Sequence, residues 1–186
     1  MRYPDYAVFS EEIRKSENMA REESGSSFAL MHRAAEALLD ALLREVPDAS
    51  NVLIAAGGGN NGGDGLELAA LLLERGIGAL CILPKDPKPG TEAAEALAHL
   101  RSAGGKTVRE FPAPGQLHGF DLIVDAVLGI GVRSPLREDA ADFIRKINES
   151  GLRVLSVDVP SGLSADSGAA PDGAVRAEWT VSLLGL

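Results

Sequence analysis

The stretch NVLIAAGGGNNGGDGLELAALLLER, residues 51–75, decides the fold. Residues 51–56 form a short, largely apolar run typical of a buried strand, and residues 66–75 have the apolar pattern of a helix. Between them lies GGGNNGGDG (57–65), in which six of nine residues are glycine. A buried strand that leads into a helix through such a loop indicates an α/β domain built on a parallel sheet.

The same alternation of strands and helices continues on both sides of this stretch. Further strands are predicted at 78–83, 106–111, 121–128, 152–157 and 175–184, and further helices at 10–24, 27–46, 91–102 and 135–148. The strands are apolar along nearly their whole length, which is typical of a mostly parallel sheet covered by helices on both faces. The helices predicted at 10–24 and 27–46 precede the first strand. The prediction is therefore an α/β fold with N-terminal helices.

Length and composition restrict the class of protein. A chain of 186 residues with 45% hydrophobic residues suits one globular domain. The formal net charge of −9 argues against a nucleic-acid partner, although backbone N–H groups can still hold a compact nucleotide. No run approaches the roughly 20 apolar residues of a membrane span, so no membrane partner is expected. The single cysteine, Cys81, is predicted to be buried, and it favours a reduced, cytoplasmic location.

Three loops rich in glycine and polar residues follow three of the predicted strands. They are GGGNNGGDG (57–65), GIGVRSP (129–135) and DVPSGLSAD (158–166). In a parallel sheet the carboxyl ends of the strands share one edge, and ligands bind beyond that edge. The three loops are therefore expected to converge on one binding or active site.

The first loop has two interpretations. The N–H groups at the start of the following helix can bind an anion such as a pyrophosphate, or the glycines can simply form a tightly packed turn. Asn60, Asn61 and Asp64 favour the binding interpretation, because they place three polar side chains in the turn. The loop is not a P-loop, and no acidic residue closes the strand at 78–83, so an ordinary dehydrogenase is less favoured.

Several polar side chains in or next to the three loops are candidates for chemistry. Asp125 lies in an apolar strand, where it either caps a neighbouring turn or binds a cation. Asp158 stands at a strand tip, as an acid–base group or as the cap of a turn. Asn61, Asp125 and Ser161 together offer oxygen ligands to a hard cation. Arg133 either contacts phosphate or is a solvated loop charge.

The three histidines lie outside the three loops. His32, His99 and His118 are each expected to be structural or solvated. No cluster of cysteine and histidine is visible along the sequence, so zinc or another metal that prefers nitrogen and sulfur ligands is not expected.

The three loop motifs, together with LMHRAAEAL (30–38), resemble the NAD(P)H-hydrate epimerase family, also called the YjeF N-terminal domain. The motifs are G-x-G-N-N-G-G-D-G, D-A-x-x-G-x-G and D-V-P-S-G-L in this order, and the resemblance covers about residues 8–186. It implies a Rossmann-like three-layer α/β/α sandwich and one such domain over residues 1–186. It further implies epimerisation of the 6-hydroxy group of hydrated NADH or NADPH (NADHX or NADPHX), with a potassium ion in the site.

The resemblance also assigns roles to individual residues. Potassium would be bound by Asn61, Asp125 and Ser161. Asp158 would be the catalytic acid–base group, with Asp64 as the second candidate. The residues expected to contact substrate are Asn60, Asn61, Gly62, Gly63, Asp64, Gly129, Ile130, Gly131, Val132, Arg133, Ser134, Pro135 and Asp158.

Two departures from the family pattern give further expectations. Ala35 stands where the family usually has glycine. The family usually continues by about one strand and a lysine-containing turn beyond the position of Leu186. The domain is therefore expected to lack that last strand, either as an excised part of a bifunctional enzyme with a hydrate dehydratase or as a truncated chain.

Two questions of function stay open at this stage. A non-catalytic relative would be a scaffold domain of the same fold that binds a nucleotide ligand or a protein. The presence of Asn61, Asp125, Asp158 and Ser161 together favours the enzyme. The apolar stripe at 31–46 also suggests a homodimer, and the choice between NADHX and NADPHX is not determined by these residues.

Overall fold

The sheet at the centre of the molecule is parallel throughout in the computed structural model, which describes residues 27–131 and 135–183. Within these ranges it has six strands in the order β3-β2-β1-β4-β5-β6. The strands are β1 Asn51–Ala56, β2 Gly78–Ile82, β3 Lys106–Val108, β4 Leu122–Ala126, β5 Arg153–Val157 and β6 Trp179–Val181. The helices are α2 Ser27–Glu45, α3 Asn60–Glu74, α4 Glu92–Ser102 and α5 Glu138–Glu149, with the 3-10 helix η1 at Pro114–Gly119.

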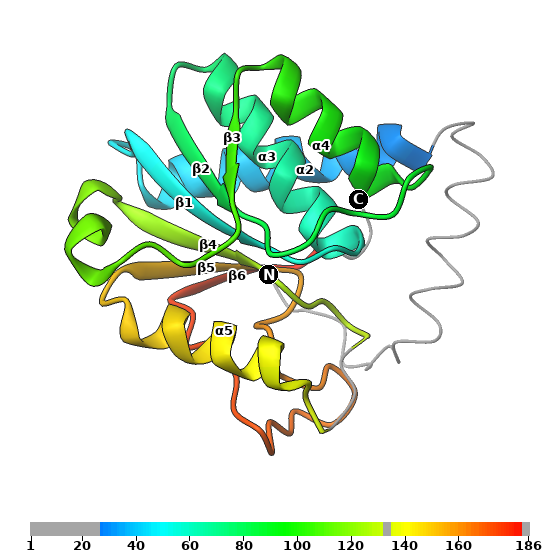
Figure 1. Cartoon of the computed structure of the whole chain (residues 1–186), viewed down its shortest axis with the longest axis vertical. Helices are drawn as coiled ribbons and strands as arrows, with labels where there is room; N and C mark the ends of the chain where they lie inside the picture. Colours follow the sequence, from blue (N-terminus) through cyan, green and yellow to red (C-terminus); the bar gives the residue numbers. More distant parts are fainter. Residues whose placement is uncertain (1–26, 132–134, 184–186) are drawn as a thin grey trace, which may run out of the picture.

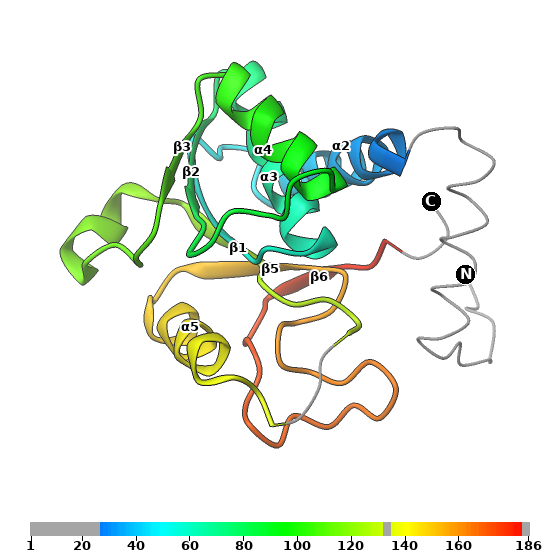
Figure 2. The same cartoon turned by 45° about the vertical axis from the view of Figure 1, so that its right-hand side comes forward.

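The helices form two outer layers. α2, α3 and α4 pack against one another over one face of the sheet, and α5 covers the other face (Figure 1). The chain between β5 and β6 runs on the same side as α5 (Figure 2). The predicted Rossmann-like three-layer fold is therefore confirmed.

The strand residues are buried on both faces, which explains why the strands are almost continuously apolar. Side chains alternate between the faces along each strand. Val52 and Ile54 of β1 lie in the core beneath α2, α3 and α4, whereas Leu53 and Ala55 lie in the core beneath α5. Cys81 is also fully buried, as predicted, and burial raises the pKa of its thiol to about 12.

The predicted start of the third helix is wrong. α3 begins at Asn60 rather than Leu66, so most of the predicted glycine loop is the first part of the helix. Glycine lowers helix propensity, but tertiary packing outweighs it here. A Cβ at Gly63 would lie 2.5 Å from Cε of Met31, and one at Gly65 would lie 2.6 Å from Cβ of Ala126. The glycines thus let α3 approach both α2 and the sheet.

Other boundaries differ because polar contacts end the strands early. β4 stops at Ala126, since the next two N–H groups, of Val127 and Leu128, donate to side chains of Asp125 and Ser161. The last strand begins at Trp179 rather than at the predicted residue 175, because the N–H groups of Val175 and Arg176 donate to the carbonyl of Ser161 and the side chain of Asn148. It ends at Val181, and residue 184 of the predicted strand lies outside the described residues. The strand predicted at 106–111 ends at 108, and η1 was not predicted. The predicted helix at 10–24 lies outside the described residues.

Two substitutions test the packing of α3. A Cβ at Gly62 would overlap the carbonyl oxygen of Gly57, whereas a Cβ at Gly59 would meet nothing within 4 Å. We expect Gly62→Ala to lower the free energy of unfolding by about 1–3 kcal/mol through overpacking. Gly59→Ala should stay within about 0.5 kcal/mol of the parent protein. Urea denaturation measures both, and a Gly62→Ala protein as stable as Gly59→Ala would contradict this packing.

Candidate active site

The three polar loops meet at the carboxyl ends of neighbouring strands. β1, β4 and β5 are adjacent in the sheet, and the strand order reverses between β1 and β4. Ligands of open α/β sheets bind at such a switch point. The N–H of Gly57 donates to the carbonyl of Ala126 at 3.0 Å, which ties the start of the first loop to the end of β4. The predicted placement of the three loops at one edge of the sheet is confirmed.

Asp125 connects β4 to the third loop. Its carboxylate is fully buried and accepts hydrogen bonds on both oxygens. Oδ1 accepts from Oγ of Ser161 at 2.6 Å and from the N–H of Val127 at 3.3 Å. Oδ2 accepts from Oγ of Ser156 at 2.8 Å and from the N–H of Ser161 at 2.9 Å. Asp125 therefore caps the turn at Ser161, which is one of its two predicted roles.

The charge of Asp125 has no cationic partner among these contacts. All four donors are neutral groups. Burial raises the pKa of the Asp125 carboxyl, and the hydrogen bonds from Ser161, Ser156 and Val127 oppose that rise. A buried carboxylate that is held only by neutral donors is an electrostatically favourable place for a cation.

Asp158 adopts an unusual backbone conformation at the end of β5. Its φ is 66°, in the left-handed region that few non-glycine residues adopt, and such strain is common at functional sites. The side chain is half-buried and accepts hydrogen bonds from the backbone N–H groups of Ile130 and Leu183. These donors lie in other segments, so the carboxylate does not form a local turn cap. Burial raises the pKa of Asp158, and the two N–H groups oppose that rise.

Asn61 and Asp158 approach each other across Gly129. A Cβ on Gly129 would lie 3.4 Å from Cγ of Asn61 and 3.4 Å from Oδ2 of Asp158. The Nδ2 atom of Asn61 is buried and has no hydrogen-bond partner, the one such side-chain atom within the described ranges. An orphaned buried amide indicates a missing partner, and its oxygen and nitrogen can exchange places by rotation. The amide can therefore donate a hydrogen bond to an acceptor through its nitrogen or bind a cation through its oxygen.

The start of α3 supplies backbone donors to the same place. The first N–H groups of a helix have no partner within the helix, and Gly59 gives no side-chain cap. Gly63 is already engaged, because its N–H donates to the carbonyl of Gly59 at 2.9 Å. Asn60 is exposed and Asp64 is half-buried in this first turn. The helix start is suited to an anion such as a phosphate.

The second loop is described only in part. Gly129 and Ile130 are half-buried, and Gly131 and Pro135 are exposed. Val132, Arg133 and Ser134 lie outside the described residues, so the predicted phosphate contact of Arg133 stays a prediction. Gly162 in the third loop has a φ of 94°, and a Cβ added there would lie 2.3 Å from the carbonyl oxygen of Gly173, so the position favours glycine.

Two of the three histidines pack against a buried carboxylate, in keeping with the structural role that is one of the two predicted for them. His32 and His99 both contact Glu67, which is fully buried in α3. Hydrogen bonds to Glu67 are the main cause of the raised pKa of His99. Residues 32, 67 and 99 are distant in sequence, so no local spacing reveals the cluster. The one available signal is a glutamate in the otherwise apolar run 66–73.

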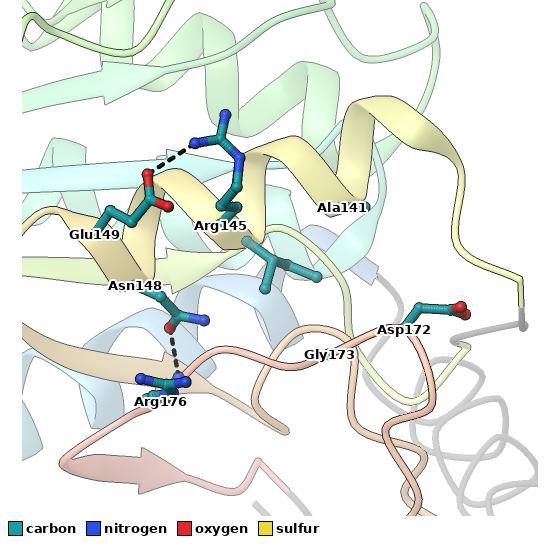
Figure 3. A pocket seen from close by; sticks show the side chains of 8 residues that line it. Ala141, Arg145, Asn148, Glu149, Asp172, Gly173 and Arg176 are labelled. Carbon is teal, nitrogen blue, oxygen red and sulfur yellow. Dashed lines mark hydrogen bonds and ion pairs between the residues drawn. The ribbon is translucent and has the colours of Figure 1, made fainter.

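A shallow hollow of about 500 Å³ lies elsewhere, between α5 and residues 172–176 (Figure 3). Its polar groups already serve the fold. Arg145 pairs with Glu149 at 2.7 Å, and Asn148 accepts the N–H of Arg176 at 2.8 Å. Asp172 accepts the N–H of Leu136 at 3.0 Å. The hollow is therefore a weaker candidate than the switch point.

A parallel sheet with helices on both faces and polar loops at its switch point defines a Rossmann-like α/β domain, a class whose ligands bind at that point. The family described as YjeF-related protein N-terminus matches residues 27–186. The chain belongs to this family.

Named relatives extend this comparison. The chain is 38% identical to the bifunctional NAD(P)H-hydrate repair enzyme Nnr of Coxiella burnetii, covering 93% of the chain and 35% of that protein. It is 35% identical to the NAD(P)H-hydrate epimerase of Limosilactobacillus fermentum, covering 96% of the chain and 85% of that protein. The chain thus spans about a third of the bifunctional relative and most of the epimerase.

The fold is also found in a solved structure. A crystal structure of the yeast protein ynu0 (YNL200c) has a TM-score of 0.80 and covers 95% of the chain and 80% of that protein. At 24% sequence identity, this likeness concerns the fold alone. Within the described ranges, no helix combines the length and the apolar character needed to cross a membrane.

Proposed function

We propose that the protein is an NAD(P)H-hydrate epimerase, an isomerase that interconverts the R and S forms of NADHX or NADPHX at C6. The observation that carries this proposal is the arrangement of Asp158, a half-buried carboxylate in a left-handed conformation, beside Gly129 and the orphaned amide of Asn61. The relatives named as epimerases support the reaction class.

The nucleotide part of the substrate lies at the start of α3 in this proposal. The free N–H groups there and the loop that begins at Gly129 hold its phosphates. The hydrated ring then extends toward Asp158, between Gly129 and Asn61. In this proposal the three loops predicted to contact substrate form one continuous site.

The proposed chemistry follows from the structure of the hydrate. C6 bears a hydroxyl group and the ring nitrogen, so it is a carbinolamine. Protonated Asp158 donates its proton to the hydroxyl, the C6–O bond breaks, and water leaves with the bonding electrons. The nitrogen lone pair stabilises the resulting cation. Water then adds to the opposite face, which inverts C6, and releases one proton to solvent, while Asp158 takes up a proton from solvent for the next turnover. Asp64 is the second candidate for this role.

A potassium ion is part of the proposal, with Asn61, Asp125 and Ser161 as its ligands. The residues fit such an ion. The Asp125 carboxylate is buried among neutral donors, Oγ of Ser161 lies 3.1 Å from the carbonyl oxygen of Leu128, and the Asn61 amide has no partner. This set is rich in oxygen, as hard cations require. When bound, the ion supplies positive charge that offsets Asp125 and holds the loops together.

The dependence on potassium provides the first test of the function. Purified protein is incubated with a mixture of NADHX isomers in potassium chloride, and their interconversion is followed by chromatography. We expect interconversion well above the rate without protein, falling at least about tenfold when choline replaces potassium, because choline is too large for the site. Folded protein that gives no acceleration would favour the scaffold domain. Equal rates in both salts would remove potassium from the proposal.

The pH dependence of kcat/KM tests the role of Asp158. Asp158 acts first as an acid, so the active enzyme carries the proton. Its folded pKa is raised above the ordinary value of 3.8. The proton is present below that raised pKa and lost above it, so kcat/KM should fall as pH rises through it. A rate that increases with pH over the same window would contradict an acid role.

Three further features belong to the proposal. The metabolic partner of the epimerase is a hydrate dehydratase, on the same chain or a separate one, because relatives named as bifunctional repair enzymes occur.

The proposed location of the protein is the cytoplasm, in keeping with the free thiol of Cys81. The homodimer stays a prediction, and the stripe that suggested it is largely accounted for, since Leu38, Leu39 and Leu42 lie in the chain's own core.

A further inference from the structure

Three helices bring together His32, Glu67 and His99, none of which belongs to the proposed active site. His32 comes from α2, Glu67 from α3 and His99 from α4. One ligand atom from each of the three lies within 4.8 Å of the others. Glu67 is fully buried, whereas the side chains of His32 and His99 are 40% and 28% exposed. The cluster therefore has a buried base and a side open to solvent.

Both imidazoles direct the same ring nitrogen at the same carboxylate. Nδ1 of His32 lies 2.6 Å from Oε1 of Glu67, and Nδ1 of His99 lies 2.9 Å from that oxygen. The Glu67 carboxylate requires a positively charged or strongly donating partner, because an unpaired carboxylate is costly at a fully buried site. Two protonated nitrogens can supply that partner, and so can one divalent cation.

The surroundings of the Nε2 atoms favour a divalent cation over two protonated nitrogens. Nε2 of His99 lies 3.2 Å from a carboxylate oxygen of Glu74, within hydrogen-bond distance, whereas Nε2 of His32 lies 3.9 Å from one of Glu36, beyond it. A histidine that binds a metal usually donates its other N–H to a carboxylate, which fixes its orientation. Here His99 has such a carboxylate, Glu74, at its Nε2 atom, and both rings share Glu67 at their Nδ1 atoms.

The distances are compatible with an ion after small movements. Zinc bonds to nitrogen and oxygen of about 2.0–2.2 Å place neighbouring ligand atoms about 3.4 Å apart. The two Nδ1–Oε1 distances, 2.6 Å and 2.9 Å, need to open by less than about 1 Å to reach that value. The histidines are partly exposed, so their rings can make this adjustment without disturbing the core.

We propose that His32, Glu67 and His99 form a binding site for a divalent transition-metal ion of the zinc class. Two imidazoles and one carboxylate are a ligand set that such ions favour, and the remaining positions are left to water. The ion joins α2, α3 and α4, so it stabilises the helical layer that carries the start of α3. This site is separate from the proposed potassium site and does not depend on the epimerase activity.

The test uses protein without a histidine tag, freed of metal by a chelator. Co²⁺ is titrated as the probe, and its visible absorption reports coordination by nitrogen ligands. We expect one Co²⁺ per chain, displaced by Zn²⁺. Zn²⁺ should also raise Tm by roughly 5–10 °C at a hundredfold excess of free ion over its Kd.

Single variants assign the signal to the cluster. His32→Gln and His99→Gln should each weaken Co²⁺ binding at least about tenfold, since each removes one of three ligands. His118→Gln is the matched control, because His118 is exposed in η1. Circular dichroism verifies that each variant is folded, and the partly exposed histidines are substituted rather than buried Glu67. Absence of a Co²⁺ signal, or a signal that survives both His32→Gln and His99→Gln, would overturn the proposal and leave an ion-pair network only.

Discussion

Replacing Asp158 with asparagine is expected to lower kcat for epimerisation by at least about 100-fold, the usual contribution of a general acid–base group. The substitution removes the proton donor and keeps the shape of the side chain. Asparagine also tolerates the left-handed conformation that residue 158 adopts, with its φ of 66°. The loss of activity would therefore come from chemistry rather than from the backbone. Steady-state kinetics with separated NADHX isomers measures it.

The stability of the same variant provides the control. The pKa of Asp158 is raised in the folded protein, so its contribution to stability is fully present below the ordinary pKa of 3.8 and is lost as pH rises through the folded value. At neutral pH the neutral amide should thus be at least as stable as the charged carboxylate. A variant that is inactive because it is unfolded would say nothing of the acid role. A folded variant with full activity would exclude Asp158 and direct attention to Asp64.

Replacing Asp125 with alanine should be among the most destabilising single changes in the described part of the chain. It leaves the N–H groups of Ser161 and Val127 and the hydroxyl of Ser156 without their acceptor inside the protein. We expect a loss of about 2–4 kcal/mol in the free energy of unfolding. Urea denaturation at constant pH measures it. Stability equal to that of the parent protein would contradict the observed hydrogen bonds.

Two comparisons separate the structural role of Asp125 from its proposed ionic role. Asp121 precedes the same strand and also accepts backbone N–H groups, from Ser50 at 2.7 Å and Asn51 at 2.9 Å, but it is only half-buried. Asp121→Ala should cost less, about 1 kcal/mol. Asp125→Asn keeps the shape of the side chain without its charge, so it should retain more stability than Asp125→Ala while losing the response to potassium.

Much of the fold was predictable because the strands are buried on both faces. Continuous apolar runs such as 51–56 and 121–128 indicate a parallel sheet, and the loops after such strands must share an edge. The place of the site follows from this rule alone. Strand ends were less predictable, since side-chain contacts end them. β4 stops at Ala126 although Val127 and Leu128 are apolar.

The start of α3 and the histidine cluster depend on contacts between distant residues. Helix propensity disfavours the glycines that follow Asn60, yet Gly63 and Gly65 allow helices and sheet to pack closely there. His32, Glu67 and His99 are too far apart in the sequence to form a local motif, because they lie on three separate helices. Tertiary packing determines both the start of α3 and the histidine cluster. Local sequence patterns do not reveal such packing.

Epimerisation of NADHX in water enriched in ¹⁸O is the most direct single measurement. Chromatography with mass detection follows both the inversion at C6 and the oxygen that C6 carries, with a sample lacking protein as the background. We expect the R and S forms to interconvert far above that background, and each inverted molecule to carry ¹⁸O, because the original hydroxyl leaves as water. Folded protein that gives no interconversion would contradict the epimerase, and inversion that keeps the original oxygen would contradict the role of Asp158 in releasing water.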